Sequence, residues 1–159
     1  IEVDSRPDRG AVFRIYLPGH EGSGLPEAAE GAALPVAGGS ETILLVEDEP
    51  LILEMVTAML APLGFTVLAA ATPAEALRLA REHTGTIDLL LTDVVMPEMN
   101  GRDLVPRIQA MQPGIRVLYM SGYSQHILSN LVVLEAGLPL ISKPFSFREL
   151  AEKIREVLA

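Results

Sequence analysis

Short apolar runs alternate with helical patterns along most of this chain. Runs of strand length occupy residues 42–46, 65–69, 87–92, 115–120 and 138–142. Each run is almost continuously apolar, which is typical of a strand that is buried on both faces of a parallel sheet. The pattern therefore predicts an α/β fold with a parallel, doubly wound sheet.

Helical patterns fill the intervals between these strands. They cover residues 51–60, a stretch beginning at 72–75, part of 100–111, residues 123–135, and a last stretch beginning at 146–149. Thr72 with Glu75 and Ser146 with Glu149 form capping boxes, which mark helix starts. The last stretch repeats its apolar residues with the period of a helix that packs on a sheet.

The N-terminal segment follows a different pattern. Residues 1–4 and 11–17 are predicted as two strands, which residues 5–10 join through a turn. A lone hairpin is only marginally stable in water, so we expect these strands to complete a sheet of a longer protein. Residues 19–41 are rich in Gly, Ala, Pro and Glu, as in a flexible linker. We therefore expect a fragment at 1–18, a linker at 19–41 and a domain at 42–159.

Composition narrows the classes of function. The net charge of −9 disfavours nucleic acid as a direct partner, because phosphate contacts need clustered Lys and Arg. The sequence contains no Cys, which excludes thiolate metal sites and fits a reducing compartment such as the cytoplasm. No apolar run is long enough to span a membrane, so we expect no membrane contact by these residues, although a longer parent could be anchored elsewhere.

Chemically active residues follow four of the predicted strands. Glu47 and Asp48 follow the first, Asp93 the third, Ser121 the fourth and Lys143 the fifth. The carboxyl ends of parallel strands share one edge of the sheet, so these residues should converge. Three carboxylates repel one another in a partly desolvated cleft and need a cation. Mg²⁺ suits such oxygen ligands and, with the lysine, would bring the total charge to zero.

These positions resemble the receiver domain of two-component response regulators. Residues 46–49 look like its acidic motif, 92–101 its phosphoacceptor segment, 120–122 its hydroxyl motif and 143–145 its lysine motif. The resemblance covers residues 42–159. It implies a flavodoxin-like (βα)5 fold with strand order 2-1-3-4-5.

The resemblance also implies roles for the residues around the phosphoryl group. Asp93 would accept a phosphoryl group from a phosphohistidine, a transfer in which catalysis is mostly positioning and charge neutralisation. Ser121 would hydrogen-bond one phosphoryl oxygen and Lys143 would pair with another. The peptide bond between Lys143 and Pro144 is expected to be cis.

A magnesium ligand set is implied in the same way. Asp48 and Asp93 would bind Mg²⁺ directly, together with the backbone carbonyl of Val95. Glu47 would bind it directly or through water. The expected cofactor is therefore Mg²⁺ alone.

The N-terminal strands resemble the end of the ATP-binding domain of sensor histidine kinases. With the receiver, this indicates a hybrid sensor histidine kinase, a phosphotransferase, of which this chain would catalyse only its own phosphorylation and dephosphorylation. The expected partners are a histidine kinase dimerisation domain or a histidine phosphotransfer protein. The open edges of the N-terminal strands could also pair two copies into a homodimer.

One position departs from the family. Receivers usually carry Tyr or Phe three residues before the motif lysine, and here that residue is Leu140. Tyr123, two residues after Ser121, is the hypothetical substitute that would follow a movement of the hydroxyl loop.

The first helix of the domain has more apolar surface than one sheet can bury. Its apolar residues include Leu51, Met55 and Met59, and the whole set covers an arc wider than a core-facing helix needs. We expect part of this face to dock on a helical partner, with the methionines providing adaptable contacts. Isolated exposed apolar residues are also common, so an ordinary surface is the alternative.

Two other functions compete with a phosphoacceptor. An aspartyl phosphohydrolase usually has a second acid two residues after its nucleophile, and Val95 occupies that position here. A receiver-like scaffold without phosphorylation would lack the acceptor Asp or the Lys, and this sequence contains both.

Overall fold

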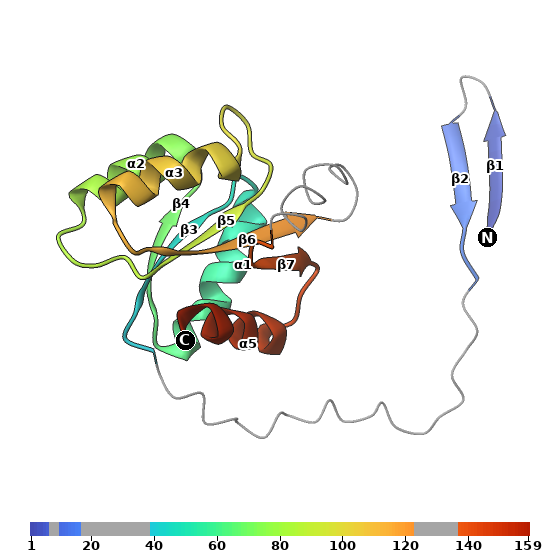
Figure 1. Cartoon of the computed structure of the whole chain (residues 1–159). Coiled ribbons are helices and arrows are strands. Elements are labelled where there is room, and N and C mark those ends of the chain that lie inside the picture. The colour runs from blue at the N-terminus through green and yellow to red at the C-terminus, as the bar shows by residue number, and fades with distance from the viewer. Residues whose placement is uncertain (7–9, 17–38, 123–136) are drawn as a thin grey trace, which may run out of the picture. The chain divides into compact units, whose positions relative to one another are not determined.

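The structure is a computed structural model that describes residues 1–6, 10–16, 39–122 and 137–159 (Figure 1). The chain divides into two units, Ile1–Pro35 and Val36–Ala159, and each is described by itself. The predicted helix at 123–135, with Tyr123, and most of the predicted linker lie outside the described residues.

The larger unit is built on a five-stranded parallel sheet. Its strands are β3 (Thr42–Val46), β4 (Thr66–Ala70), β5 (Leu89–Asp93), β6 (Arg116–Gly122) and β7 (Leu140–Lys143). They pair in the order β4-β3-β5-β6-β7, which confirms the predicted 2-1-3-4-5 topology. All the pairs are parallel, so every strand ends at the same edge of the sheet.

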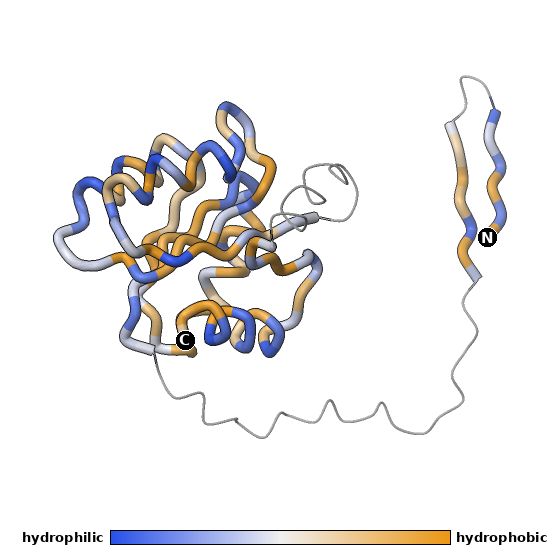
Figure 2. The backbone as a smooth tube through the Cα atoms, viewed as in Figure 1, coloured by the Kyte–Doolittle hydropathy of each residue, from blue (hydrophilic) through white to orange (hydrophobic). Residues whose placement is uncertain are grey.

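Helices cover both faces of this sheet, as Figure 1 shows. The helices are α1 (Pro50–Leu60), α2 (Pro73–Glu82), α3 (Gly101–Met111) and α5 (Phe147–Leu158), and the 3-10 turn η1 (Ala61–Leu63) follows α1. Alternate residues of β3 point to opposite faces. Leu44 and Val46 pack with α2 and α3, whereas Ile43 and Leu45 pack with α1 and α5. Figure 2 shows apolar residues concentrated along the strands of this sheet, whereas the helices contain both apolar and polar residues.

Local sequence signals set the helix starts. The side chain of Thr72 accepts a hydrogen bond from the Glu75 backbone amide, and Ser146 with Glu149 forms a complete capping box. These caps satisfy amides that the first helical turn leaves unpaired. Among the described helices, none is long and apolar enough to cross a membrane.

The smaller unit is an antiparallel hairpin of β1 (Glu2–Arg6) and β2 (Gly10–Arg14). Val3 lies opposite Phe13 in the hairpin register, and both side chains are exposed. The apolar residues of the hairpin therefore have no core of their own among the described residues.

Candidate functional site

The carboxyl edge of the sheet brings the predicted site residues together. Glu47 directly follows β3, Asp93 is the last residue of β5, and Lys143 is the last residue of β7. Ser121 is the next-to-last residue of β6, and its register partner on β7 is Ser142. Residues almost one hundred positions apart in the sequence therefore meet at one end of the fold.

Lys143 lies between two of the carboxylates. Its Nζ is 2.6 Å from Oδ2 of Asp93 and 2.5 Å from Oε2 of Glu47. The Glu47 side chain is only 1% exposed, while those of Lys143 and Asp93 are 14% and 15% exposed. The ammonium group therefore neutralises charge in a site that is largely shielded from water.

Burial and nearby charges shift the pKa values of Glu47 and Lys143. Burial raises the pKa of Glu47, and the negative charge of Asp93 raises it further, against the lowering effect of Lys143. Burial lowers the pKa of Lys143, but hydrogen bonds and charges from Asp93 and Glu47 outweigh it, so the net pKa is raised. Lys143 is therefore held in its charged form, whereas the ionised form of Glu47 is disfavoured.

Three carboxylates converge closely enough to share one cation. An oxygen atom from each of Glu47, Asp48 and Asp93 lies within 4.8 Å of the other two. An all-oxygen donor set of this kind fits a hard divalent ion such as Mg²⁺. When all three carboxylates are ionised, Lys143 supplies only one positive charge against three negative ones, so the acidic cluster then has an excess of negative charge.

The loop after β5 holds the Asp93 carboxylate in place. The backbone amide of Val95 donates to Oδ1 of Asp93 at 3.1 Å. Together with Lys143 on Oδ2, this contact fixes both carboxylate oxygens. Ser121 is 3% exposed, and its hydroxyl donates to the Gly122 carbonyl at 3.5 Å, at the long limit of a hydrogen bond. This weak contact leaves the hydroxyl free to rotate toward another acceptor.

Gly101 is a site residue whose role the sequence did not indicate. A Cβ atom at this position would lie 2.3 Å from the Asp93 carbonyl oxygen, so only glycine allows α3 to approach β5 this closely. Its amide also donates to the Val94 carbonyl at 2.9 Å. The signal was visible only as a glycine at the start of a helical pattern, which by itself does not distinguish a close approach from an ordinary turn.

The structure also describes the predicted cis peptide bond and the burial of the predicted switch and docking residues. The peptide bond between Lys143 and Pro144 is cis, as expected. Leu140 is half-buried against the core on the α2 and α3 side. Met55 is 44% exposed on α1, whereas Met59 is half-buried against the core on the α1 and α5 side.

Comparisons with known proteins agree with this geometry. The family described as "Response regulator receiver domain" matches residues 43–155. Sensor kinase CckA of Brucella abortus (strain 2308) is 34% identical over 165 residues, which cover 99% of this chain but 18% of that protein. Response regulator receiver protein CpdR of the same organism is 30% identical over 116 residues, which cover 73% of this chain and 95% of CpdR.

Solved structures agree as well. The receiver domain from hybrid histidine kinase CckA is 32% identical with a TM-score of 0.61, and the match covers 74% of this chain and 99% of that one. A CheY-like receiver domain protein from Methanospirillum hungatei JF-1 is 31% identical with a TM-score of 0.65. That match covers 76% of this chain and 94% of the other chain. The chain therefore belongs to the response regulator receiver domain family and carries a receiver domain of two-component signalling.

Proposed function

We propose that Asp93 is the phosphoacceptor of this receiver domain and takes its phosphoryl group from a phosphohistidine. The observation that carries the proposal is the position of Lys143, whose ammonium group contacts both Asp93 and Glu47 within a converging acidic cluster. An isolated surface aspartate would have neither this cation nor this shielding from water.

The transfer uses the groups around Asp93 directly. One carboxylate oxygen of Asp93 forms a bond to phosphorus while the bond between phosphorus and the histidine nitrogen breaks, and the electron pair of that bond returns to the imidazole. Lys143 stays charged and binds a phosphoryl oxygen, which compensates the negative charge that arrives. Ser121 donates its hydroxyl to another phosphoryl oxygen in place of its weak contact with the Gly122 carbonyl.

Mg²⁺ is the proposed cofactor. Glu47, Asp48 and Asp93, with the backbone carbonyl of Val95, would hold it, and the oxygen-only donor set fits this ion. When bound, the ion supplies charge neutralisation for the phosphoryl oxygens. The excess negative charge of the acidic cluster supports this assignment, because Lys143 alone does not balance it.

The competing functions are less well supported. A phosphohydrolase with an aspartyl nucleophile needs a proton donor near its acceptor, and Val95 provides none where such enzymes usually carry a second acid. A scaffold that is never phosphorylated has no need for Lys143 between two buried or half-buried acids.

The wider context that we propose is a cytoplasmic part of a hybrid sensor kinase. The similarity to sensor kinase CckA extends over 99% of this chain, so it includes the N-terminal hairpin as well as the receiver. In this proposal residues 1–18 complete the kinase ATP-binding domain, 19–41 are the linker and 42–159 are the receiver. The exposed apolar side chains of Val3 and Phe13 would then be covered by the rest of that domain, or by a second copy in the isolated chain.

The proposed partner surface lies on α1. Leu51 and Met55 are 74% and 44% exposed near the start of this helix, which follows the loop that carries Asp48. An apolar helical face next to the acidic site fits a helical phosphohistidine donor, such as a kinase dimerisation domain or a phosphotransfer protein. Met59 would contribute less, because it already packs against the core.

Intact-mass measurement tests the phosphoacceptor proposal. The chain is incubated with Mg²⁺ and acetyl phosphate, and the wild type should gain the mass of one phosphoryl group. Asp93→Asn should gain none, because its amide is not a nucleophile. The matched control is Asp103→Asn, which changes an exposed carboxylate in the first turn of α3 and should gain the group normally. A full gain by Asp93→Asn would overturn the proposal.

A further inference from the structure

The outer edge of β4 has no partner strand in the part of the chain that the structure describes. β4 stands at one end of the strand order, next to β3. At the start of β4 the amide of Thr66 donates to the Glu41 carbonyl at 3.0 Å. At its end the Ala70 carbonyl accepts from the Glu47 amide at 3.2 Å. A residue that pairs in a parallel ladder directs both its amide and its carbonyl to the same neighbour, so the even-numbered residues of β4 face β3.

The odd-numbered residues of β4 face outward. Val67 and Ala69 each direct an amide and a carbonyl away from β3, and none of these groups bonds to a residue within the described ranges. The next outward amide, that of Ala71, donates to Oε2 of Glu75 at 3.0 Å and is already satisfied. The open part of the edge is therefore the backbone of Val67 and Ala69.

The sequence around this edge contains no charge. No Asp, Glu, Lys, Arg or His occurs from residue 55 to residue 74, although the whole chain has a net charge of −9. Natural proteins usually protect an exposed edge with charged side chains, with proline or with a bulge, and β4 contains none of these. Two copies of this acidic chain repel each other, and an uncharged edge is where they can approach at the lowest electrostatic cost.

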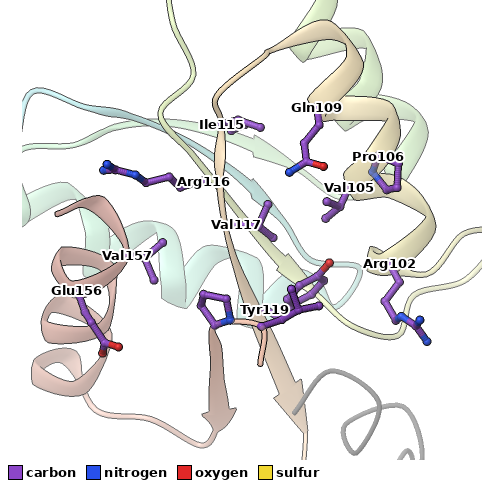
Figure 3. A pocket seen from close by; sticks show the side chains of 12 residues that line it. Arg102, Val105, Pro106, Gln109, Ile115, Arg116, Val117, Tyr119, Glu156 and Val157 are labelled. Atoms are coloured by element: carbon purple, nitrogen blue, oxygen red, sulfur yellow. The ribbon is translucent and has the colours of Figure 1, made fainter. Parts of the chain in front are cut away.

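The edge at the other end of the sheet is protected. β7 lies between Pro139 and Pro144 and ends in Lys143, and prolines and lysines of this kind discourage strand addition. Among the described residues, a hollow lined by parts of α3, β6 and α5 lies beside that end (Figure 3). Residues 123–136, which connect β6 to β7, lie outside the described residues. Because β4 is at the opposite end of the strand order, its pairing and its outward groups do not depend on that segment.

The open edge is complementary to itself. When two copies of β4 run antiparallel with Leu68 opposite Leu68, Val67 of each copy lies opposite Ala69 of the other. The two residues of each such pair then exchange both of their backbone hydrogen bonds, which satisfies all the outward groups. Leu68 is half-buried on the α2 and α3 side, and the two Leu68 side chains meet across the symmetry axis as an apolar pair. A two-fold contact of this kind closes on itself and adds no third copy.

We infer that a second copy of this chain binds the outer edge of β4 by antiparallel strand pairing, which joins the two five-stranded sheets. The two carboxyl edges then point in opposite directions, so neither acidic site is part of the contact. A contact made mainly by two short strands should bury less than the roughly 1,200–2,000 Å² of stable complexes, so the dimer should form only at high protein concentration. The inference is independent of which residue accepts a phosphoryl group.

Amide hydrogen exchange of the full chain, followed by nitrogen-15 NMR at low and at high protein concentration, tests the inference. Analytical ultracentrifugation gives the fraction of dimer at each concentration. When about nine-tenths of the chain is dimeric, the amides of Val67 and Ala69 should exchange about tenfold more slowly than in dilute solution, because exchange proceeds only from the remaining monomer. The Leu68 amide, which faces β3, is the internal reference and should exchange slowly at both concentrations. Amides of β1 and β2 report any pairing of the hairpins in the same spectra.

Ala69→Pro removes one outward amide. Ala69 is exposed, and an outward amide on an edge strand is the position in a sheet where proline is tolerated. The variant should abolish the slowing at Val67. Ala69→Val is the matched control, which keeps the amide and should retain the slowing. Slow exchange of the Leu68 amide in the same spectra shows that each variant is folded.

Three results would overturn the inference. Rapid exchange of the Val67 and Ala69 amides at both concentrations would show that the edge stays unpaired. Slow exchange at both concentrations would show that another segment of the same chain covers the edge. Slowing with concentration that persists in Ala69→Pro would place the contact elsewhere on the molecule.

Discussion

At the scale of single residues, Lys143 has the largest predicted effect on stability. Removing one partner of a buried ion pair leaves the other charge uncompensated, which typically costs about 3–5 kcal/mol. Lys143→Met should therefore lower the free energy of unfolding by roughly that amount at neutral pH without metal, as measured by urea denaturation. This substitution leaves the carboxylate of Glu47, whose side chain is 1% exposed, next to Asp93 without a cation between them.

The second lysine of the sequence provides a matched control. Lys153 pairs with Glu156 across one turn of α5, and their side chains are 28% and 68% exposed. Ion pairs at the surface of a helix contribute at most about 1 kcal/mol, so Lys153→Met should have a small effect. Equal losses of stability for the two variants would show that the site does not hold Lys143 as described.

Glu47 gives a prediction about pH. Its pKa in the folded state is raised above the ordinary value of 4.5, chiefly by burial. A carboxyl group with a raised folded pKa favours folding while it is protonated, and that contribution is lost as pH rises through the folded pKa. With chelator present, the wild type should therefore lose stability relative to Glu47→Gln as pH rises from 4.5 toward neutral. A difference that stays constant over this range in thermal unfolding would contradict the assignment.

Most residues of the site were predictable because they stand at the ends of apolar runs. Glu47, Asp93 and Lys143 could be placed at one sheet edge from the pattern alone, and the structure brings them into contact. The role of Gly101 was not predictable in the same way. A close backbone approach depends on how two elements pack, which the residue pattern within one element does not contain.

At the scale of elements, the contact between α3 and β5 has a testable weak point. Gly101→Ala would place a methyl group 2.3 Å from the Asp93 carbonyl, against backbone that cannot rotate away. Overpacking of this kind typically costs about 1–3 kcal/mol, and the shift of Asp93 should also slow phosphorylation by acetyl phosphate. Urea denaturation and the rate of mass gain measure the two effects.

Gly122→Ala is the control for this variant in the unfolding experiment. A Cβ atom at Gly122 would meet nothing within 4 Å. Alanine there should leave the free energy of unfolding nearly unchanged. Gly101→Ala with wild-type stability and wild-type phosphorylation would show that the close approach does not position Asp93.

The order and type of the described elements followed from apolar periodicity, whereas their ends moved by one or two residues. The strand predicted at 87–92 is observed as Leu89–Asp93, so Asp93 is part of the ladder and pairs with Met120. The strand predicted at 138–142 begins only at Leu140. Pro139 precedes this strand and has no amide hydrogen to donate. Its carbonyl still accepts a hydrogen bond from the backbone amide of Tyr119 at 3.0 Å. Strand ends depend on backbone pairing, which hydropathy does not report.

At the scale of the whole molecule, we expect phosphorylation by a protein donor and phosphorylation by a small-molecule donor to be separable. Met55→Glu should slow transfer from a phosphohistidine donor about tenfold, the effect of losing about 1.4 kcal/mol of docking free energy. Phosphorylation of the same variant by acetyl phosphate should stay unchanged, because a small donor needs no docking face. Rates of mass gain with each donor test this. Equal slowing with both donors would contradict a docking role for the exposed face of α1.

In the proposed function, one aspartate carries the phosphoryl group, in an acidic site that Lys143 and Mg²⁺ neutralise. Tandem mass spectrometry of peptides, after reaction with acetyl phosphate and Mg²⁺, locates that group most directly. We expect a single modified residue, Asp93, and loss of the modification when Mg²⁺ is chelated before the reaction. A phosphoryl group on His83, on Asp48 or on any other residue in place of Asp93 would contradict it.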